Sequence, residues 1–126
     1  NPIPTEARKE FIRAFKAKNP NNDVTQQRIV NALQMVVTAM EETQSTDPYT
    51  IALALEDMRF TNMSGEELWM RGSDHQIFQS LHVSVHTDEG VEFDADNSGF
   101  GLLSEYHVPA EETIVESSCQ MQRPRR

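Results

Sequence analysis

The sequence is short of cysteine, since Cys119 is the one thiol among 126 residues. A single thiol cannot form a disulfide within the chain, and it cannot make a zinc site without other ligands. Cys119 is therefore either an inert small side chain or the partner of a cysteine outside this chain. Long apolar runs are also missing, because no stretch approaches the ~20 apolar residues that a helix needs to span a bilayer.

Positive charge is scarce as well. Lys and Arg number 11 against 20 Asp and Glu, which gives a formal net charge of −9. A phosphate backbone would be repelled by this field, so the composition argues against a nucleic-acid partner. Residues 1–4 lack the basic start and apolar run of a signal peptide. A start at Asn1 rather than Met suggests a processed product or a piece of a longer protein.

The first half of the chain predicts three helices. Thr5 can cap a helix over residues 6–18. Asp23, three residues before Gln26, offers a capping box for a second helix, and Asp47 with Pro48 supplies the N-cap and first-turn proline of a third. The second helix has a face with apolar residues at helical period, namely Ile29, Val30, Leu33, Val36, Val37 and Met40. The third has Ile51, Ala54, Leu55 and Met58.

The second half predicts strands. Leu68 and Met70 alternate with Trp69, which places Trp69 on the opposite face, where we expect it to pack. Residues 81–86 alternate apolar and polar side chains as a half-buried strand does. Residues 102–108 predict one more strand, and the pattern then fades into an extended tail.

The order of these elements predicts an incomplete α/β fold. A doubly wound sheet needs strands that alternate with helices, and here the strands are few and follow the helices. We divide the chain into a helical part (1–60), a part that is mainly strands (61–108) and a tail (109–126). The apolar helix faces need strands from another stretch of polypeptide. The isolated chain is therefore expected to self-associate or to need the rest of its parent.

A series of segments along the chain has a recognisable order. The helical half carries Phe-Ile-Arg-Ala-Phe-Lys-Ala-Lys (11–18), Asn-Ala-Leu-Gln (31–34), Ser-Thr-Asp-Pro (45–48) and Ala-Leu-Ala-Leu-Glu (52–56). The second half carries the more specific Met-Arg-Gly-Ser-Asp-His-Gln (70–76), Gln-Ser-Leu-His-Val-Ser (79–84), Gly-Phe-Gly (99–101) and Val-Pro-Ala-Glu-Glu-Thr (108–113). Together they resemble the C-terminal region of type 1 periplasmic solute-binding proteins of the branched-chain amino acid ABC-transporter family.

This resemblance implies a partial lobe of an α/β protein, three helices followed by a few β-strands, whose parent has two lobes joined by hinge strands. It implies a receptor without enzymatic activity or cofactor, working in the periplasm or outside the cell. The receptor would bind a small ligand by hinge closure and then contact the membrane permease of an ABC transporter. A ligand-sensing regulatory receptor of the same fold is the first alternative.

The ligand site that the resemblance implies lies mostly outside this chain. Relatives carry an aromatic residue near the start of the second helix that helps to line the pocket, and Gln27 is the nearest positional match here. Gln27 is thus the one ligand-binding residue predicted. Because an amide stands where a ring is expected, the implied ligand is a branched-chain amino acid or a related small acid or amide.

A different class of function is indicated by Asp94, Asp96, Ser98 and Glu105. With glycine at the sixth position, they fit the spacing of an EF-hand calcium loop. The context disagrees, because a strand and a turn precede the loop and Pro109 follows it, where an EF-hand has helices. We expect an ordinary polar loop and no metal site, with a small calcium-binding protein as the alternative.

The histidines raise the question of a transition metal or an enzyme. His82 and His86 would face the same side of a strand, but four strand residues span about 13 Å, too far for one zinc ion. Asp74 and His75 look like part of a catalytic triad, yet sequence neighbours seldom face each other, and no activated nucleophile accompanies them. We predict solvent-facing histidines, no catalytic residues and no enzyme.

Overall fold

The computed structural model describes residues 5–22, 27–91 and 97–123. The helices are α1 (Glu6–Lys18), α2 (Gln27–Thr43) and α3 (Pro48–Leu55), and the strands are β1 (Arg59–Thr61), β2 (Glu67–Met70), β3 (Ile77–Phe78), β4 (Leu81–Thr87) and β5 (Gly101–Val108), with a 3-10 helix, η1 (Ala110–Thr113), after them. Helices followed by a few antiparallel strands confirm the predicted fold class. Over these residues, no helix is both long and apolar enough to cross a membrane.

Helix α1 begins and ends at the predicted residues. The Thr5 hydroxyl accepts a hydrogen bond from the backbone N–H of Arg8 at 3.3 Å, and Asn19 caps the other end. The same hydroxyl donates to the Met63 carbonyl, while Arg8 Nη1 donates to Ser64 Oγ at 3.1 Å. These contacts attach the start of α1 to the turn between β1 and β2.

The third helix also follows its sequence signals. Asp47 caps α3 by accepting a hydrogen bond from the backbone N–H of Thr50 at 2.9 Å, and Pro48 occupies the first turn. Proline suits this position because the first-turn N–H groups have no partner within a helix. The predicted capping box of Asp23 and Gln26 lies outside the described residues.

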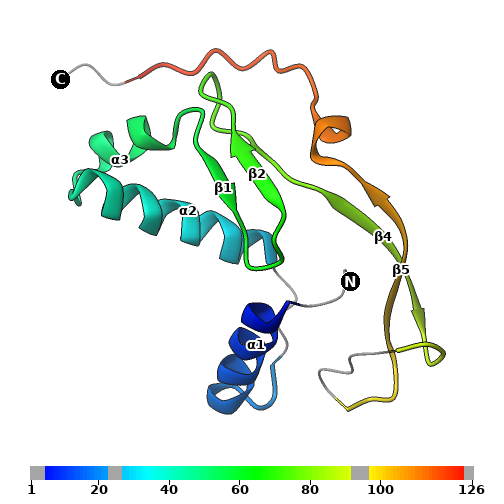
Figure 1. Cartoon of the computed structure of the whole chain (residues 1–126). Helices are drawn as coiled ribbons and strands as arrows, with labels where there is room; N and C mark the ends of the chain where they lie inside the picture. Colours follow the sequence, from blue (N-terminus) through cyan, green and yellow to red (C-terminus); the bar gives the residue numbers. More distant parts are fainter. Residues whose placement is uncertain (1–4, 23–26, 92–96, 124–126) are drawn as a thin grey trace.

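The buried core joins α2 and α3 to β2 (Figure 1). It consists of Met35, Ala39, Leu55, Met58, Leu68 and Met70. On β3, Phe78 is 2% exposed and contacts the Trp69 ring, with 4.8 Å between the ring centroids. Trp69 therefore packs against a neighbouring ring, as predicted.

Most of the predicted apolar stripe of α2 lies outside the core of this chain. The buried side chains of this helix are Asn31, Met35 and Ala39. Ile29, Leu33 and Val37 belong to the predicted stripe, but they are 58%, 61% and 51% exposed. Val36, another member of the stripe, packs against the core, so the stripe is only partly covered within this chain. We call the surface of Ile29, Leu33 and Val37 the outer α2 face.

A small antiparallel sheet covers the core. Its strand order is β1-β2-β3, with Phe60 paired to Leu68 and Met70 paired to Ile77. The sequence does not predict β1 and β3, because strands of three and two residues are too short to show alternation.

Strands β4 and β5 form a separate antiparallel ribbon that extends away from the helices (Figure 1). His82 pairs with His107, and a register shift between Val83 and Ser84 marks a β-bulge. The expectation of a half-buried β4 is wrong for Val83 and Val85, which are both exposed. Exposed apolar side chains on β5 are Leu102, Leu103 and Tyr106. The ribbon thus exposes apolar surface on both strands.

Candidate functional site

Gln27, the predicted ligand-binding residue, lies at the start of α2 in a chain of three amide side chains. Gln27 Nε2 donates to Asn31 Oδ1 at 3.1 Å, and Asn31 Nδ2 donates to Gln79 Oε1 at 3.0 Å. Asn31 is 1% exposed, whereas Gln27 is half-buried. These bonds link the first turn of α2 to the chain between β3 and β4.

A primary amide carries two N–H donors and a carbonyl acceptor. Gln27 can therefore hold Asn31 and still offer polar groups to a ligand. The ligand role of Gln27 stays a prediction. The sequence does not reveal the part of Gln79, because the two amides lie 48 residues apart and their meeting depends on how the sheet packs on α2.

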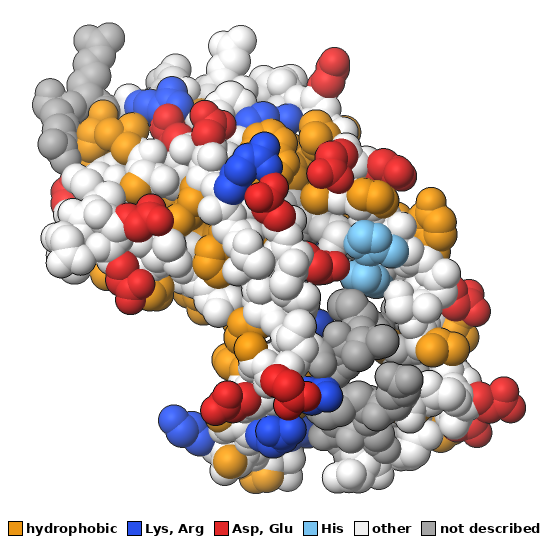
Figure 2. Space-filling model, viewed as in Figure 1, with side chains coloured by type: hydrophobic (Ala, Val, Ile, Leu, Met, Phe, Trp, Pro, Cys, Tyr) orange, Lys and Arg blue, Asp and Glu red, His pale blue; other side chains and the backbone are white. Residues whose placement is uncertain are grey.

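A second polar cluster joins the β1–β2 hairpin to the ribbon. Glu66 Oε1 lies 3.2 Å from His82 Nε2 and 3.7 Å from His107 Nε2. The two imidazole centroids are 4.8 Å apart, with the rings tilted by 34°. Histidine side chains gather beside an acidic side chain on the face shown in Figure 2. We call Glu66, His82 and His107 the histidine–glutamate cluster.

The backbone positions each member of this cluster. His82 and His107 are direct cross-strand partners, and the side chains of such partners lie side by side on one face. Glu66 is placed by Asn62, whose Oδ1 accepts hydrogen bonds from the backbone N–H groups of Ser64 at 2.9 Å and Glu66 at 3.1 Å. Asn62 is buried, so a fixed turn presents the carboxylate to the ribbon.

The carboxylate of the cluster is stabilised in its charged form. Burial raises the pKa of Glu66, but the neighbouring Ser80 hydroxyl and His82 imidazole outweigh this effect, so the pKa lies below its ordinary value. The Glu66 charge also acts on Arg8 of α1. Burial lowers the pKa of Arg8, and the negative charge of Glu66 offsets part of this decrease. Glu66 is therefore an anionic group at neutral pH.

The expectation of solvent-facing histidines on β4 is wrong for His82. Its side chain is 20% exposed and belongs to the cluster. His86 is exposed, as predicted, and stacks on Phe100 with 5.3 Å between centroids. In the part of the chain that the structure describes, the group of side chains placed to hold a metal ion contains His82 but not His86. The partners of His82 are His107 and Glu66, and only the strand register identifies them.

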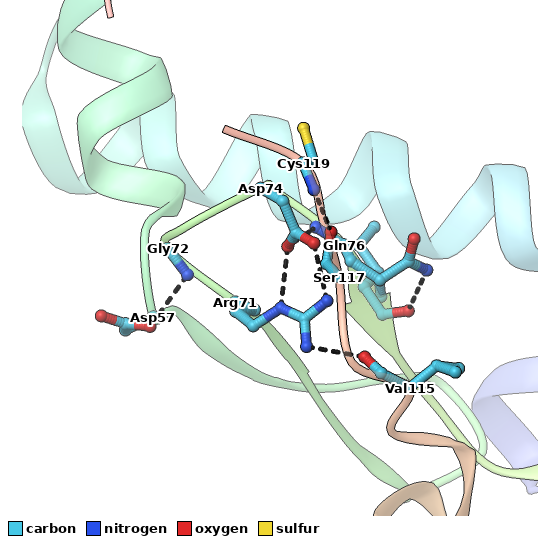
Figure 3. A network of polar contacts seen from close by, with 9 residues as sticks. Asp57, Arg71, Gly72, Asp74, Gln76, Val115, Ser117 and Cys119 are labelled. Carbon is cyan, nitrogen blue, oxygen red and sulfur yellow. Dashed lines mark hydrogen bonds and ion pairs between the residues drawn. The ribbon is translucent and has the colours of Figure 1, made fainter. Parts of the chain in front are cut away.

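Asp74 and His75, the triad-like pair, take part in different contacts. The Arg71 guanidinium donates to both oxygens of Asp74, from Nε at 2.9 Å and from Nη2 at 2.6 Å (Figure 3). This bond is the largest cause of the lowered pKa of the Asp74 carboxyl. His75 Nε2 instead lies 3.6 Å from Glu56 Oε1. The two side chains serve different partners and do not form the Asp–His pair of a triad.

The same arginine holds the C-terminal tail. Arg71 Nη1 donates to the Val115 carbonyl at 2.9 Å (Figure 3), and Arg123 Nη2 donates to the Gly72 carbonyl at 2.9 Å. The tail runs back past the strands toward α3 (Figure 1). Cys119 lies on this tail and is exposed. The specific segment at residues 70–76 thus forms an anchor for the tail.

The calcium-loop alternative gains no support from the elements around it. Asp94 and Asp96 lie outside the described residues. Ser98 Oγ accepts a hydrogen bond from the backbone N–H of Phe100 at 3.2 Å, and Glu105 lies within β5. An EF-hand places helices on both sides of its loop, whereas β4 and β5 flank this one.

Comparison with known proteins links this arrangement to one solute-binding protein. No protein-family model matches the chain, and no curated protein is significantly similar to it. The fold is similar to that of the leucine-, isoleucine-, valine-, threonine- and alanine-binding protein from Brucella ovis in its closed conformation, with a TM-score of 0.78 and 25% identity. The likeness covers 98% of this chain and 33% of that protein. The chain thus has the fold of about a third of an amino-acid-binding protein.

Proposed function

We propose that this chain is the C-terminal part of a two-lobed solute receptor of the branched-chain amino acid ABC-transporter type. The observation that carries the proposal is the likeness to the Brucella ovis protein, which extends over 98% of the chain at a TM-score of 0.78. So complete a match places the helices, the small sheet and the ribbon in one shared arrangement. The tail, which the Arg71 anchor holds, belongs to the same unit.

The exposed apolar surfaces support a larger parent. The outer α2 face and the ribbon both expose apolar side chains, and single-domain proteins rarely leave such patches uncovered. In an α/β lobe, helices pack against strands of a central sheet. The proposed parent supplies those strands to the outer α2 face.

The proposed mechanism is ligand capture without chemistry. An amino acid or a related small acid or amide enters between the lobes, which close on it by hinge motion. Polar groups fix the ammonium and carboxylate, and an apolar pocket holds the side chain. Gln27 contributes an amide to this site from the first turn of α2. The closed receptor, in the periplasm or outside the cell, then contacts a membrane permease.

Calorimetry on the product of the whole gene that encodes this chain tests the proposal. Leucine, valine, alanine, threonine and glutamine are titrated separately, and the proposal predicts saturable binding of at least one of them. Gln27→Ala is compared with Gln120→Ala, a control on the exposed tail. We expect the first to weaken binding at least about tenfold, the effect of losing one hydrogen bond to a charged ligand group, and the second to leave it unchanged.

The outcomes separate the receptor from the role of Gln27. Absence of binding to every amino acid at millimolar concentration contradicts the proposed function. Binding that Gln27→Ala leaves unchanged keeps the receptor and removes Gln27 from its site.

A further inference from the structure

We propose that Glu66, His82 and His107 form a zinc site that joins the β1–β2 hairpin to the β4–β5 ribbon. Their three ligand atoms lie within 4.8 Å of one another. The residues come from three separate segments, and each is positioned by the backbone or by a buried neighbour. This site is distinct from the proposed amino-acid site and does not depend on it.

Two of the three distances between ligand atoms are close to those of a tetrahedral zinc site. Ligand atoms about 2.0–2.1 Å from zinc stand roughly 3.3–3.4 Å apart at the corners of a tetrahedron. Glu66 Oε1 lies 3.2 Å from His82 Nε2 and 3.7 Å from His107 Nε2. The two imidazole nitrogens lie within 4.8 Å of each other, so the His107 ring has to rotate toward both partners to complete the geometry.

The hydrogen bond between His82 and Glu66 does not explain why His107 also faces the Glu66 carboxylate. The His82–Glu66 contact has hydrogen-bond length, but the His107 nitrogen stays at 3.7 Å from the same oxygen. A divalent cation between the three groups satisfies all of them, provided that both rings are neutral, as metal ligands must be.

The donor set and its neighbours favour zinc over calcium or magnesium. Imidazole nitrogen and carboxylate oxygen are ordinary zinc ligands, whereas calcium and magnesium prefer oxygen alone. The second nitrogen of His82 lies 3.2 Å from Ser104 Oγ. Such a partner fixes the tautomer and the orientation of a ligating ring.

The site is open on one side. The side chain of His107 is 51% exposed, against 29% for Glu66 and 20% for His82. Three protein ligands with an open fourth position leave room for water or for a ligand from a partner. Because the ligands belong to two sheets, zinc would clamp the ribbon to the hairpin and raise the thermal stability of the chain.

Zinc titration by calorimetry tests the site. The reference protein for this titration is the chain with Cys119→Ser, which removes the exposed thiol as a competing ligand. Glu66→Gln, His82→Ala and His107→Ala remove the ligands one at a time. His86→Ala is the matched control, because His86 lies on the same strand, exposed and outside the cluster. Far-UV circular dichroism checks that each variant is folded, and the exposed position of His107 makes its substitution the mildest.

We expect the Cys119→Ser reference protein and its His86→Ala variant to bind one zinc ion per chain. Their Tm should rise when zinc is added. Each ligand variant should weaken zinc binding by more than the roughly 10–100-fold that the loss of an outer hydrogen bond costs. Calcium should not bind at this site. The inference is overturned if the Cys119→Ser reference protein binds no zinc at millimolar concentration, or if a folded His107→Ala protein binds zinc as tightly as His86→Ala.

Discussion

Asn31, buried in α2, donates a hydrogen bond from its side-chain amide to Gln79 at 3.0 Å and accepts one from Gln27 at 3.1 Å. One buried amide thus ties the helix layer to the chain between the two sheets. It also connects the structural core to the residue that we propose for the ligand. The stability of the fold and the position of Gln27 therefore depend on the same side chain.

Replacing this amide should destabilise the protein. Asn31→Ala leaves the half-buried amide of Gln79 without its partner, and the loss of a hydrogen-bond partner inside a protein costs about 1–3 kcal/mol. Urea denaturation measures the change in the free energy of unfolding. Asn21→Ala, in the exposed turn after α1, is the control and should stay within about 0.5 kcal/mol. Equal effects of the two substitutions would count against a structural role of Asn31.

The outer α2 face should tolerate charge while the inner face does not tolerate truncation. Leu33 is 61% exposed and Met35 is fully buried. Leu33→Glu is expected to change the free energy of unfolding by less than about 0.5 kcal/mol, whereas Met35→Ala should cost about 2–5 kcal/mol. Sedimentation at rising concentration should show less self-association for Leu33→Glu than for the parent chain. Unchanged self-association would show that another surface is responsible.

Arg71 should control the order of the C-terminal tail. Its guanidinium binds Asp74 through two nitrogens and Val115 through the third. Arg71→Lys keeps the charge but loses this fork geometry. Hydrogen exchange is expected to accelerate in residues 113–119, while the exchange of α2 stays the same. A uniform acceleration would instead report global destabilisation.

The Arg71–Asp74 pair also predicts a pH dependence. The pKa of Asp74 is lower in the folded chain than in the unfolded one, with Arg71 as the main cause. The stabilisation from ionised Asp74 is therefore present above the unfolded value of about 3.9 and is lost as the pH falls below it toward the folded value. The difference in urea midpoint between the parent and Asp74→Asn should be constant from pH 7 to 5 and should shrink below pH 4. A difference that persists unchanged at low pH would contradict this.

Sequence reasoning succeeded where the signal is local. The caps Thr5 and Asp47 marked the starts of α1 and α3, because a capping side chain bonds to backbone only three residues away. Periodicity marked the stripe that contains Leu33, but it did not reveal that Met35 is buried, because the burial of Met35 depends on where the sheet packs.

The polar clusters could not be predicted from the sequence for a similar reason. His82 meets His107 only through the register of β4 and β5, and Glu66 joins them only through the hairpin turn. The bulge beside Val83 shifts the later residues of β4 relative to β5, so spacing along one strand could not identify the partners. Long-range pairing, rather than residue type, creates both the histidine–glutamate cluster and the amide chain.

The most direct test of the account is whether the outer α2 face is covered in the natural protein. Leu33→Cys is introduced with Cys119→Ser, and the rate of reaction with a thiol reagent is measured in the isolated chain and in the product of the whole gene. A lobe that packs strands over this face should slow the reaction at least about tenfold, because the thiol then reacts only through local opening. Equal rates in the two proteins would contradict the claim that another stretch of polypeptide covers α2.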